Sequence, residues 1–198
     1  MNDDLDVLAA RLLALDRSGR GPEWTTFYER ACPRLVAWMA LHLHGALRQR
    51  IDPGDLAQET WARALTSLDS FDSERGTFLQ WLHGIARNVL RGALQTMAAR
   101  REESGGTSHA RRLEAHAEEI TGITRRAASN DTLSAFIQHL REHDPDDQML
   151  VITCALEREP IAEAARRLGI SEDAATKRWQ RLRARLASSA AAQRLLAD

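Results

Sequence analysis

The sequence predicts an all-α protein with two small helical domains joined by a flexible linker. Three observations lead to this prediction. Hydrophobic residues make up 43% of the 198 residues but aromatic residues only 5%, and the abundant Ala, Leu, Arg and Glu favour helices over sheets. Apolar residues recur three and four positions apart, and no segment alternates convincingly as a strand does. Large apolar residues become rare across residues 99–128, where a Gly-Gly pair occurs.

The overall composition excludes several classes of protein. The formal net charge is -1, so the surface as a whole has no attraction for polyanions. Cys32 and Cys154 lack the spacing of metal ligands, and we expect neither a disulfide nor a metal site. No apolar run approaches the roughly 20 residues of a membrane span. The acidic N-terminus does not resemble a signal peptide, so we expect a cytoplasmic protein with no membrane span.

The first elements follow from leucine spacing and proline positions. Residues 1–21 are expected to form an acidic tail or a short helix, because leucines recur there at helical spacing. The first domain is predicted over residues 22–98, and its first helix starts near Pro22. Pro33 indicates a break in that helix or the first turn of a new one.

Two further helices complete the first domain. Asp52 followed by Pro53 is typical of a helix start, and apolar residues after it fall on one face. Residues 69–76, DSFDSERG, have the composition of a loop. Thr77 and Gln80 then form a capping-box pattern, which predicts the start of another helix.

The C-terminal domain is also predicted to be helical. The expected boundaries are a linker over residues 99–128, the domain itself over residues 129–190 and a tail over residues 191–198. Asp144 and Pro145 are typical of a helix start, and Pro160 opens the next helix. Gly169 ends that helix, and Ser171 is positioned to cap the last one.

Residues 160–186, PIAEAARRLGISEDAATKRWQRLRARL, have the pattern of a helix-turn-helix, whose second helix enters the major groove of DNA. The small Ala165 and Ala175 allow two helices to cross closely, and Gly169 permits the turn between them. Residues 169–186 hold five basic and two acidic residues, a local charge of +3 in a nearly neutral chain. An Arg-rich helix can also be only a solvated face, which is the alternative interpretation.

Candidate contacts to duplex DNA lie at the start and along one side of the last helix. They are Ser171, Glu172, Asp173, Thr176, Lys177, Arg178 and Arg181. Lys and Arg suit phosphates and base edges, and an acidic residue accepts a hydrogen bond from the cytosine amino group. Glu172 and Asp173 have a second interpretation, because acidic residues also favour a helix N-terminus electrostatically.

The first domain contains the segments DLAQETWARA, the FD loop and TFLQWLHGIARN, with FYERACPRLVAWM upstream. With these segments it resembles the second domain of bacterial RNA polymerase sigma factors of the extracytoplasmic-function (ECF) type. IAEAARRLGIS followed by KRWQRLRARL resembles the fourth domain of the same family. Together the segments cover most of residues 22–97 and 131–187. Ala174 and Thr176 depart from the family, in which a Thr and a Lys are common at these positions.

The resemblance implies a factor that binds core RNA polymerase and directs promoter recognition and DNA melting. It implies polymerase docking by Asp55, Gln58, Glu59 and Arg63. It places Phe71, Asp72 and Ser73 in a loop that captures bases of the minus-ten element, and Trp81, His83, Arg87, Asn88 and Arg91 along the unpaired strand. Trp81 fits core packing equally well. The resemblance also implies reading of the minus-thirty-five element by the last helix, and an anti-sigma protein as a regulatory partner.

Two other interpretations remain open at the level of sequence. One is a dimeric helix-turn-helix transcriptional regulator with an N-terminal helical sensor domain, which would bind palindromic sites without polymerase. The other is an enzyme, which we do not expect, because the sequence has no Gly-rich phosphate loop and no recognisable catalytic triad. For the same reason we expect no cofactor.

Overall fold

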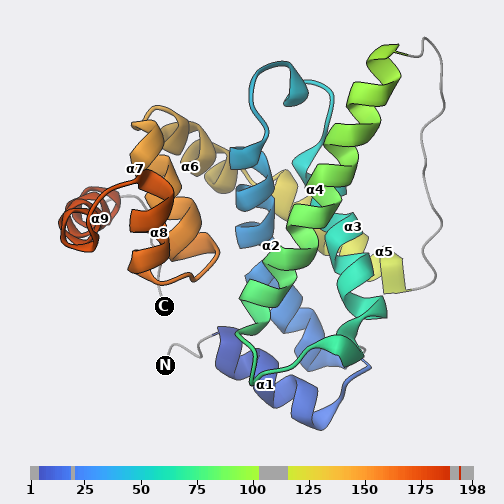
Figure 1. The fold of residues 1–198 in the computed structure, drawn as a ribbon. Helices are drawn as coiled ribbons and strands as arrows, with labels where there is room; N and C mark the ends of the chain where they lie inside the picture. Colours follow the sequence, from blue (N-terminus) through green and yellow to red (C-terminus); the bar gives the residue numbers. More distant parts are fainter. Residues whose placement is uncertain (1–4, 19–20, 103–115, 188–191, 193–198) are drawn as a thin grey trace.

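The computed structural model describes residues 5–18, 21–102, 116–187 and 192, and all regular structure within them is helical (Figure 1). The α-helices are α1 (Leu5–Leu15), α2 (Pro22–His42), α3 (Pro53–Thr66), α4 (Phe78–Glu102), α5 (His116–Ala128), α6 (Asp131–Arg141), α7 (Pro145–Leu150), α8 (Ile161–Leu168) and α9 (Glu172–Leu186). Short 3-10 turns lie at Gly45–Leu47 and Leu68–Ser70. The predicted all-α class is confirmed for the described residues.

Helix α2 forms the centre of the first bundle, with α1, α3, α4 and α5 packed around it. It is buried over most of its length and runs through Pro33 without the predicted break. Its aromatic residues meet those of α3 and α4: Phe27 lies 5.1 Å from Phe78 and Tyr28 lies 4.8 Å from Trp61, measured between ring centroids. Such edge-to-face rings bury large apolar areas and fix the relative positions of the three helices.

The two ends of the predicted linker, residues 99–128, are helical. Helix α4 extends to Glu102, residues 103–115 lie outside the described part of the chain, and α5 begins at His116. Helix α5 packs against α2 and α3 and buries Ile120, Ile123 and Ala127. These three residues recur at helical spacing and form an apolar stripe along α5. Because they are few, the overall composition of the segment did not indicate a buried helix. Residues 116–128 thus belong to the first bundle.

Helices α7 and α9 begin where the sequence predicts, and Asp144 accepts a hydrogen bond from the backbone N–H of Asp146 at the start of α7. At the start of α6, Asn130 accepts one from the backbone N–H of Leu133. Ser171 caps α9 in the same way, by accepting from the N–H of Ala174. Such caps satisfy backbone donors that the first turn of a helix leaves unpaired.

Helix α7 ends at Leu150, where the regular α-helical hydrogen bonding changes. Residues Val151–Leu156 form a π-helical segment, and Arg158 follows with a φ of 59°, which non-glycine residues rarely adopt. This segment and α6 both contact α2, so the C-terminal helices rest against the first bundle. No helix in the described part of the chain is long and apolar enough to cross a lipid bilayer.

Candidate nucleic-acid interface

Helices α8 and α9 are joined by a tight turn that the sequence makes possible. Gly169 ends α8 in the left-handed conformation with a φ of 67°, and the N–H of Ile170 donates to the carbonyl of Ala165. Ala164, Ala165 and Ala175 are buried where the two helices meet. Small side chains at these positions let the helix backbones approach closely, which fixes the direction in which α9 projects.

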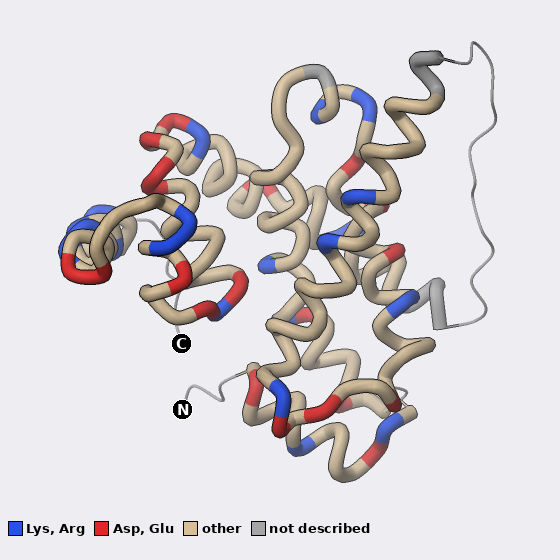
Figure 2. Tube along the Cα trace, viewed as in Figure 1, with Lys and Arg blue, Asp and Glu red and all other residues tan. Residues whose placement is uncertain are grey.

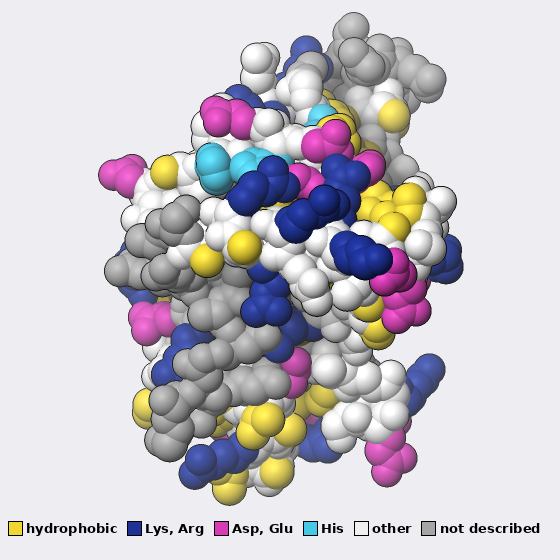
Figure 3. Space-filling model, turned by 90° about the vertical axis from the view of Figure 1, so that its left-hand side faces the viewer, with side chains coloured by type: hydrophobic (Ala, Val, Ile, Leu, Met, Phe, Trp, Pro, Cys, Tyr) yellow, Lys and Arg dark blue, Asp and Glu magenta, His cyan; other side chains and the backbone are white. Residues whose placement is uncertain are grey.

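Basic and acidic side chains are mixed on the side of the molecule where α9 lies. Figure 2 shows both kinds along α9, and Figure 3 shows that Lys and Arg side chains gather on this face with Asp and Glu between them. Lys177, Arg181 and Arg183 are exposed. Lys177 pairs with Asp173 at 2.7 Å, but both side chains are well exposed, so this pair is weak and can exchange for a phosphate.

Arg178, a predicted DNA contact, is bound by three aspartates of the protein and keeps 28% of its side-chain surface exposed. Its guanidinium donates to Asp147 at 2.6 Å and to Asp146 and Asp144 at 2.7 Å each. Arg185 donates to the second oxygen of Asp147 at 2.7 Å. Burial works against the charge on Asp147, but the two arginines outweigh it and hold the pKa of this carboxyl below its usual value. Through Asp147, Arg178 and Arg185 anchor α9 to α7.

The other predicted DNA contacts of α9 differ in how far their side chains are exposed. Ser171, Glu172 and Asp173 are exposed, and the side chain of Ser171 is already used as the N-cap. Thr176 is half-buried, and Arg181 is exposed one turn further along. Glu172 and Asp173 lie in the first turn of α9, where negative charge favours the helix dipole. Lys177 and Arg181 are therefore the exposed basic residues among the predicted contacts, and Thr176 beside them is partly exposed.

Three of the four predicted polymerase-docking residues share an exposed face of α3. Asp55, Glu59 and Arg63 are exposed, and Arg63 pairs with Glu59 one turn away. Burial, followed by the nearby charge of Asp52, raises the pKa of Asp55. Gln58 lies apart from this face, because its side-chain amide donates to Thr121 of α5 at 2.5 Å. This residue ties α5 to the bundle, a role that the sequence analysis missed.

In the loop predicted to capture nucleotide bases, the first residue is buried and the next two are exposed. Phe71 is buried and packs edge-to-face on Phe78 at 5.5 Å, whereas Asp72 and Ser73 are exposed. The capping box that follows is confirmed: Gln80 N–H donates to Thr77 Oγ1 at 3.2 Å, and Thr77 N–H donates to Gln80 Oε1 at 3.0 Å. The box fixes where α4 begins and therefore where the loop ends.

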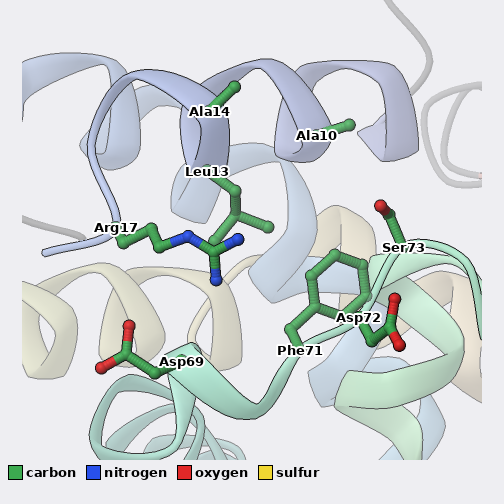
Figure 4. A pocket seen from close by; sticks show the side chains of 8 residues that line it. All are labelled: Ala10, Leu13, Ala14, Arg17, Asp69, Phe71, Asp72 and Ser73. Carbon is green, nitrogen blue, oxygen red and sulfur yellow. The ribbon is translucent and has the colours of Figure 1, made fainter.

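Helix α1 forms a wall of an open pocket of about 380 Å³ beside this loop (Figure 4). Figure 4 shows Arg17 reaching toward the pocket from the end of α1, with Phe71 on the facing side. The pocket is lined by Ala10, Leu13, Ala14, Arg17, Asp69, Phe71, Asp72 and Ser73. The contribution of α1 was not predictable from the sequence, because the helical spacing of leucines does not indicate what the helix packs against.

His83 cannot contact DNA, which corrects a further prediction. Its side chain is fully buried, and Nδ1 lies 2.8 Å from the carbonyl oxygen of Leu79. Burial lowers its pKa to about 4, so the imidazole is neutral at physiological pH. Trp81 is half-buried, and its ring packs against those of Phe71 and Phe78. This is the core packing that the sequence allowed for this residue.

Asn88 and Arg91 remain as an exposed polar pair on α4. Arg91 Nη1 lies 3.5 Å from Asn88 Oδ1, and both side chains face solvent. Arg87, the third predicted contact on this helix, forms an ion pair with Glu157 of the C-terminal part at 3.1 Å. Within the residues that the structure describes, no group of His, Cys, Asp and Glu side chains could hold a metal ion.

Comparison with protein families gives a match within the first bundle. Residues 28–100 match the family model of Sigma-70 region 2, a span from the first third of α2 to near the end of α4. Comparisons with curated proteins and with solved structures give no significant match. The span includes the exposed face of α3, the loop after it and the polar pair on α4. Residues 28–100 are therefore similar to Sigma-70 region 2, and this similarity supports a sigma factor, a class of protein that binds core RNA polymerase and promoter DNA.

Proposed function

We propose that this protein is a sigma factor of the ECF type, which binds core RNA polymerase and directs promoter recognition and DNA melting at transcription initiation. The observation that carries the proposal is the Sigma-70 region 2 match, followed in the chain by a basic helix pair. Such a factor acts in the cytoplasm and has no catalytic site of its own. An anti-sigma protein that covers its polymerase or DNA surfaces is part of the proposal.

In this proposal the exposed face of α3 docks on polymerase. Asp55, Glu59 and Arg63 give it two negative charges and one positive charge within two turns. Directional charge of this kind selects a partner and sets the geometry of docking more than it adds affinity. Gln58 supports the face from behind through its bond to α5.

The loop after α3 and the polar side of α4 would hold the melted minus-ten strand. Unpairing a base costs a few kcal/mol, and a base that stacks or enters a pocket returns about 1–3 kcal/mol. Phe71, Asp72 and Ser73 line the pocket in Figure 4, and Asn88 and Arg91 offer contacts to base edges and phosphates. The partly exposed Trp81 lies between these two groups in sequence and packs on Phe71.

The α8–α9 pair would read the minus-thirty-five element as a helix-turn-helix. Thr176, Lys177 and Arg181 extend from α9, which the Asp147–Arg178 contact holds at a fixed angle to α7. The chain as a whole is nearly neutral, so the free protein should bind DNA weakly. Two DNA-binding parts gain affinity by effective concentration once polymerase holds both near one promoter.

Reconstitution with core RNA polymerase tests this function. The full chain should co-elute with core polymerase and start transcription on a supercoiled template that core polymerase alone does not use. Arg181→Gln should reduce this transcription, whereas the matched control Arg125→Gln, exposed on α5, should not. Tight binding of a dimer of the free chain to a palindromic site, with no effect of polymerase, would support the dimeric regulator and overturn the proposal.

A further inference from the structure

The basic helix α9 is partly neutralised by carboxylates of its own chain. Three of its five Lys and Arg side chains, those of Lys177, Arg178 and Arg185, form ion pairs. In the described part of the chain, Arg181 and Arg183 have no such partner. Figure 3 shows Asp and Glu side chains among the Lys and Arg side chains on this side of the molecule. The positive charge that α9 can offer to DNA phosphates is therefore smaller than its composition indicates.

Arg178 has more carboxylate partners than the other two paired residues. Its Nε donates to Asp147 at 2.6 Å, and its Nη1 and Nη2 donate to Asp146 and Asp144 at 2.7 Å each. Each nitrogen of the guanidinium thus faces a different carboxylate at the start of α7. With 28% of its side-chain surface exposed, Arg178 can still be reached from solvent. A DNA phosphate that approaches it must compete with carboxylates that are already bound.

The three aspartates differ in what they contribute to the fold. Asp147 is buried and also binds Arg185, so its carboxylate is part of the packing between α7 and α9. The side chains of Asp144 and Asp146 are 59% and 49% exposed. In the described residues, the carboxylate of Asp146 has no polar partner besides Arg178. Because ion pairs as exposed as these add little to stability, the two outer aspartates do little to hold α9 in place.

The cluster carries more negative than positive charge. Three carboxylates face the two guanidiniums of Arg178 and Arg185, which leaves an excess of one negative charge. Asp144 and Asp146 expose this charge beside α9. A recognition helix in the major groove has a phosphate backbone on either side. Phosphates on the side of α7 would therefore meet these carboxylates, and like charges that meet at an interface weaken binding.

We infer that Asp144 and Asp146 compete with DNA phosphates for Arg178, and so limit how tightly α9 binds the DNA backbone. The inference rests on the proposed function, because it takes α9 to enter the major groove. Asp147 keeps its bond to Nε throughout, while the two outer carboxylates give up the Nη atoms when a phosphate replaces them. Phosphate contacts give affinity for any sequence, whereas base contacts select the promoter. Weaker phosphate binding makes α9 depend more on base contacts and on polymerase.

The double variant Asp144→Asn/Asp146→Asn tests this competition. Asparagine has the size of aspartate and caps a helix equally well, so the start of α7 is kept. The probe is a short labelled duplex of random sequence, titrated with the full chain from low to physiological salt. The double variant should bind it about tenfold more tightly at low salt, where phosphate contacts contribute most. The slope of log K against log salt should become steeper by about 0.9, as expected when Arg178 neutralises one more phosphate.

Glu23→Gln/Asp131→Asn is the matched control. It removes two exposed carboxylates, from the first turns of α2 and α6, and changes the net charge equally. Any gain in affinity that comes from net charge alone will appear in this control, and its slope should be that of the natural chain. The single variant Asp146→Glu keeps a carboxylate beside Arg178 and should also match the natural chain.

Three results would overturn the inference. One is a double variant with the affinity and slope of the control. Another is a higher affinity with an unchanged slope, because the aspartates would then only repel phosphates. The third is weaker binding together with lower stability in urea, which would make the outer aspartates structural supports of α9.

The single variant Asp146→Asn keeps the test valid if the double variant fails to fold. Its carboxylate binds only Arg178 in the described residues, and the cap at Asp144 stays intact. It should show a smaller gain in affinity with the same steeper slope. These titrations contain no polymerase, so their outcome is separate from the reconstitution that tests the proposed function. A chain that fails in reconstitution can still show the competition for Arg178, and the reverse also holds.

Discussion

At the scale of single residues, packing decides what a side chain can do. Arg178 and His83 are residue types that suit DNA, and the sequence places both in segments that resemble DNA-binding surfaces. In the folded chain, Arg178 is bound by Asp147, which lies 31 positions away in sequence, and His83 is enclosed. The spacing of residues could not show either outcome, because both depend on neighbours brought together by other helices.

Replacing Arg178 should reduce stability more than DNA binding by the rest of α9. Arg178→Ala leaves the buried carboxylate of Asp147 short of its main partner, and we expect the free energy of unfolding to fall by about 2 kcal/mol. Arg181→Ala, on an exposed residue of the same helix, should change it by less than about 0.5 kcal/mol. Urea denaturation of both variants compares them; equal stabilities would show that Arg178 is not a structural anchor.

His83 should give the fold a measurable pH dependence. Its pKa is about 4 in the folded chain, whereas an unfolded histidine titrates near 6.5. Its contribution to stability is therefore complete above pH 6.5 and is lost as the pH falls toward 4, at most about 3 kcal/mol in total. Histidine NMR titration should show one imidazole that stays neutral down to about pH 4. If every imidazole titrates near 6.5, His83 is not buried as described.

At the scale of elements, local signals predicted helix starts well and helix partners poorly. The caps at Asp52, Asp144 and Ser171 and the box at Thr77 lie within a few residues of the backbone that they stabilise, so the sequence contains all the information they need. Helix α5 was assigned to a linker because its apolar stripe is narrow. Its helical state depends on packing against α2 and α3, and no local signal reports that contact.

Helix α5 should contribute strongly to the stability of the first bundle. Ile123 is 3% exposed, so Ile123→Ala should lower the free energy of unfolding by about 2–4 kcal/mol. The control Arg125→Ala changes an exposed residue of the same helix and should be nearly neutral. Equilibrium urea unfolding, followed by tryptophan fluorescence, checks both. A neutral effect of Ile123→Ala would instead place residues 116–128 in the linker, as their composition suggests.

At the scale of the whole molecule, the net charge and the order of the two helical parts are consistent with the proposed function. A segment similar to Sigma-70 region 2 lies first and a basic helix pair lies last, and under the proposed function the net charge of -1 limits random binding of the free chain to DNA. The helical class was predictable from the periodicity of the apolar residues. The contact through Glu157 was not, because it joins residues more than a hundred positions apart, as the separation of 119 between Trp38 and Glu157 shows.

Transcription from a promoter library tests the central claim most directly. Core RNA polymerase is incubated with the full chain and templates whose upstream sequence is randomised, and the transcripts are sequenced from their 5′ ends. A sigma factor should yield transcripts that core polymerase alone does not, from templates enriched in two short sequences at a fixed separation upstream of the start. Identical transcript sets with and without the chain would contradict the account.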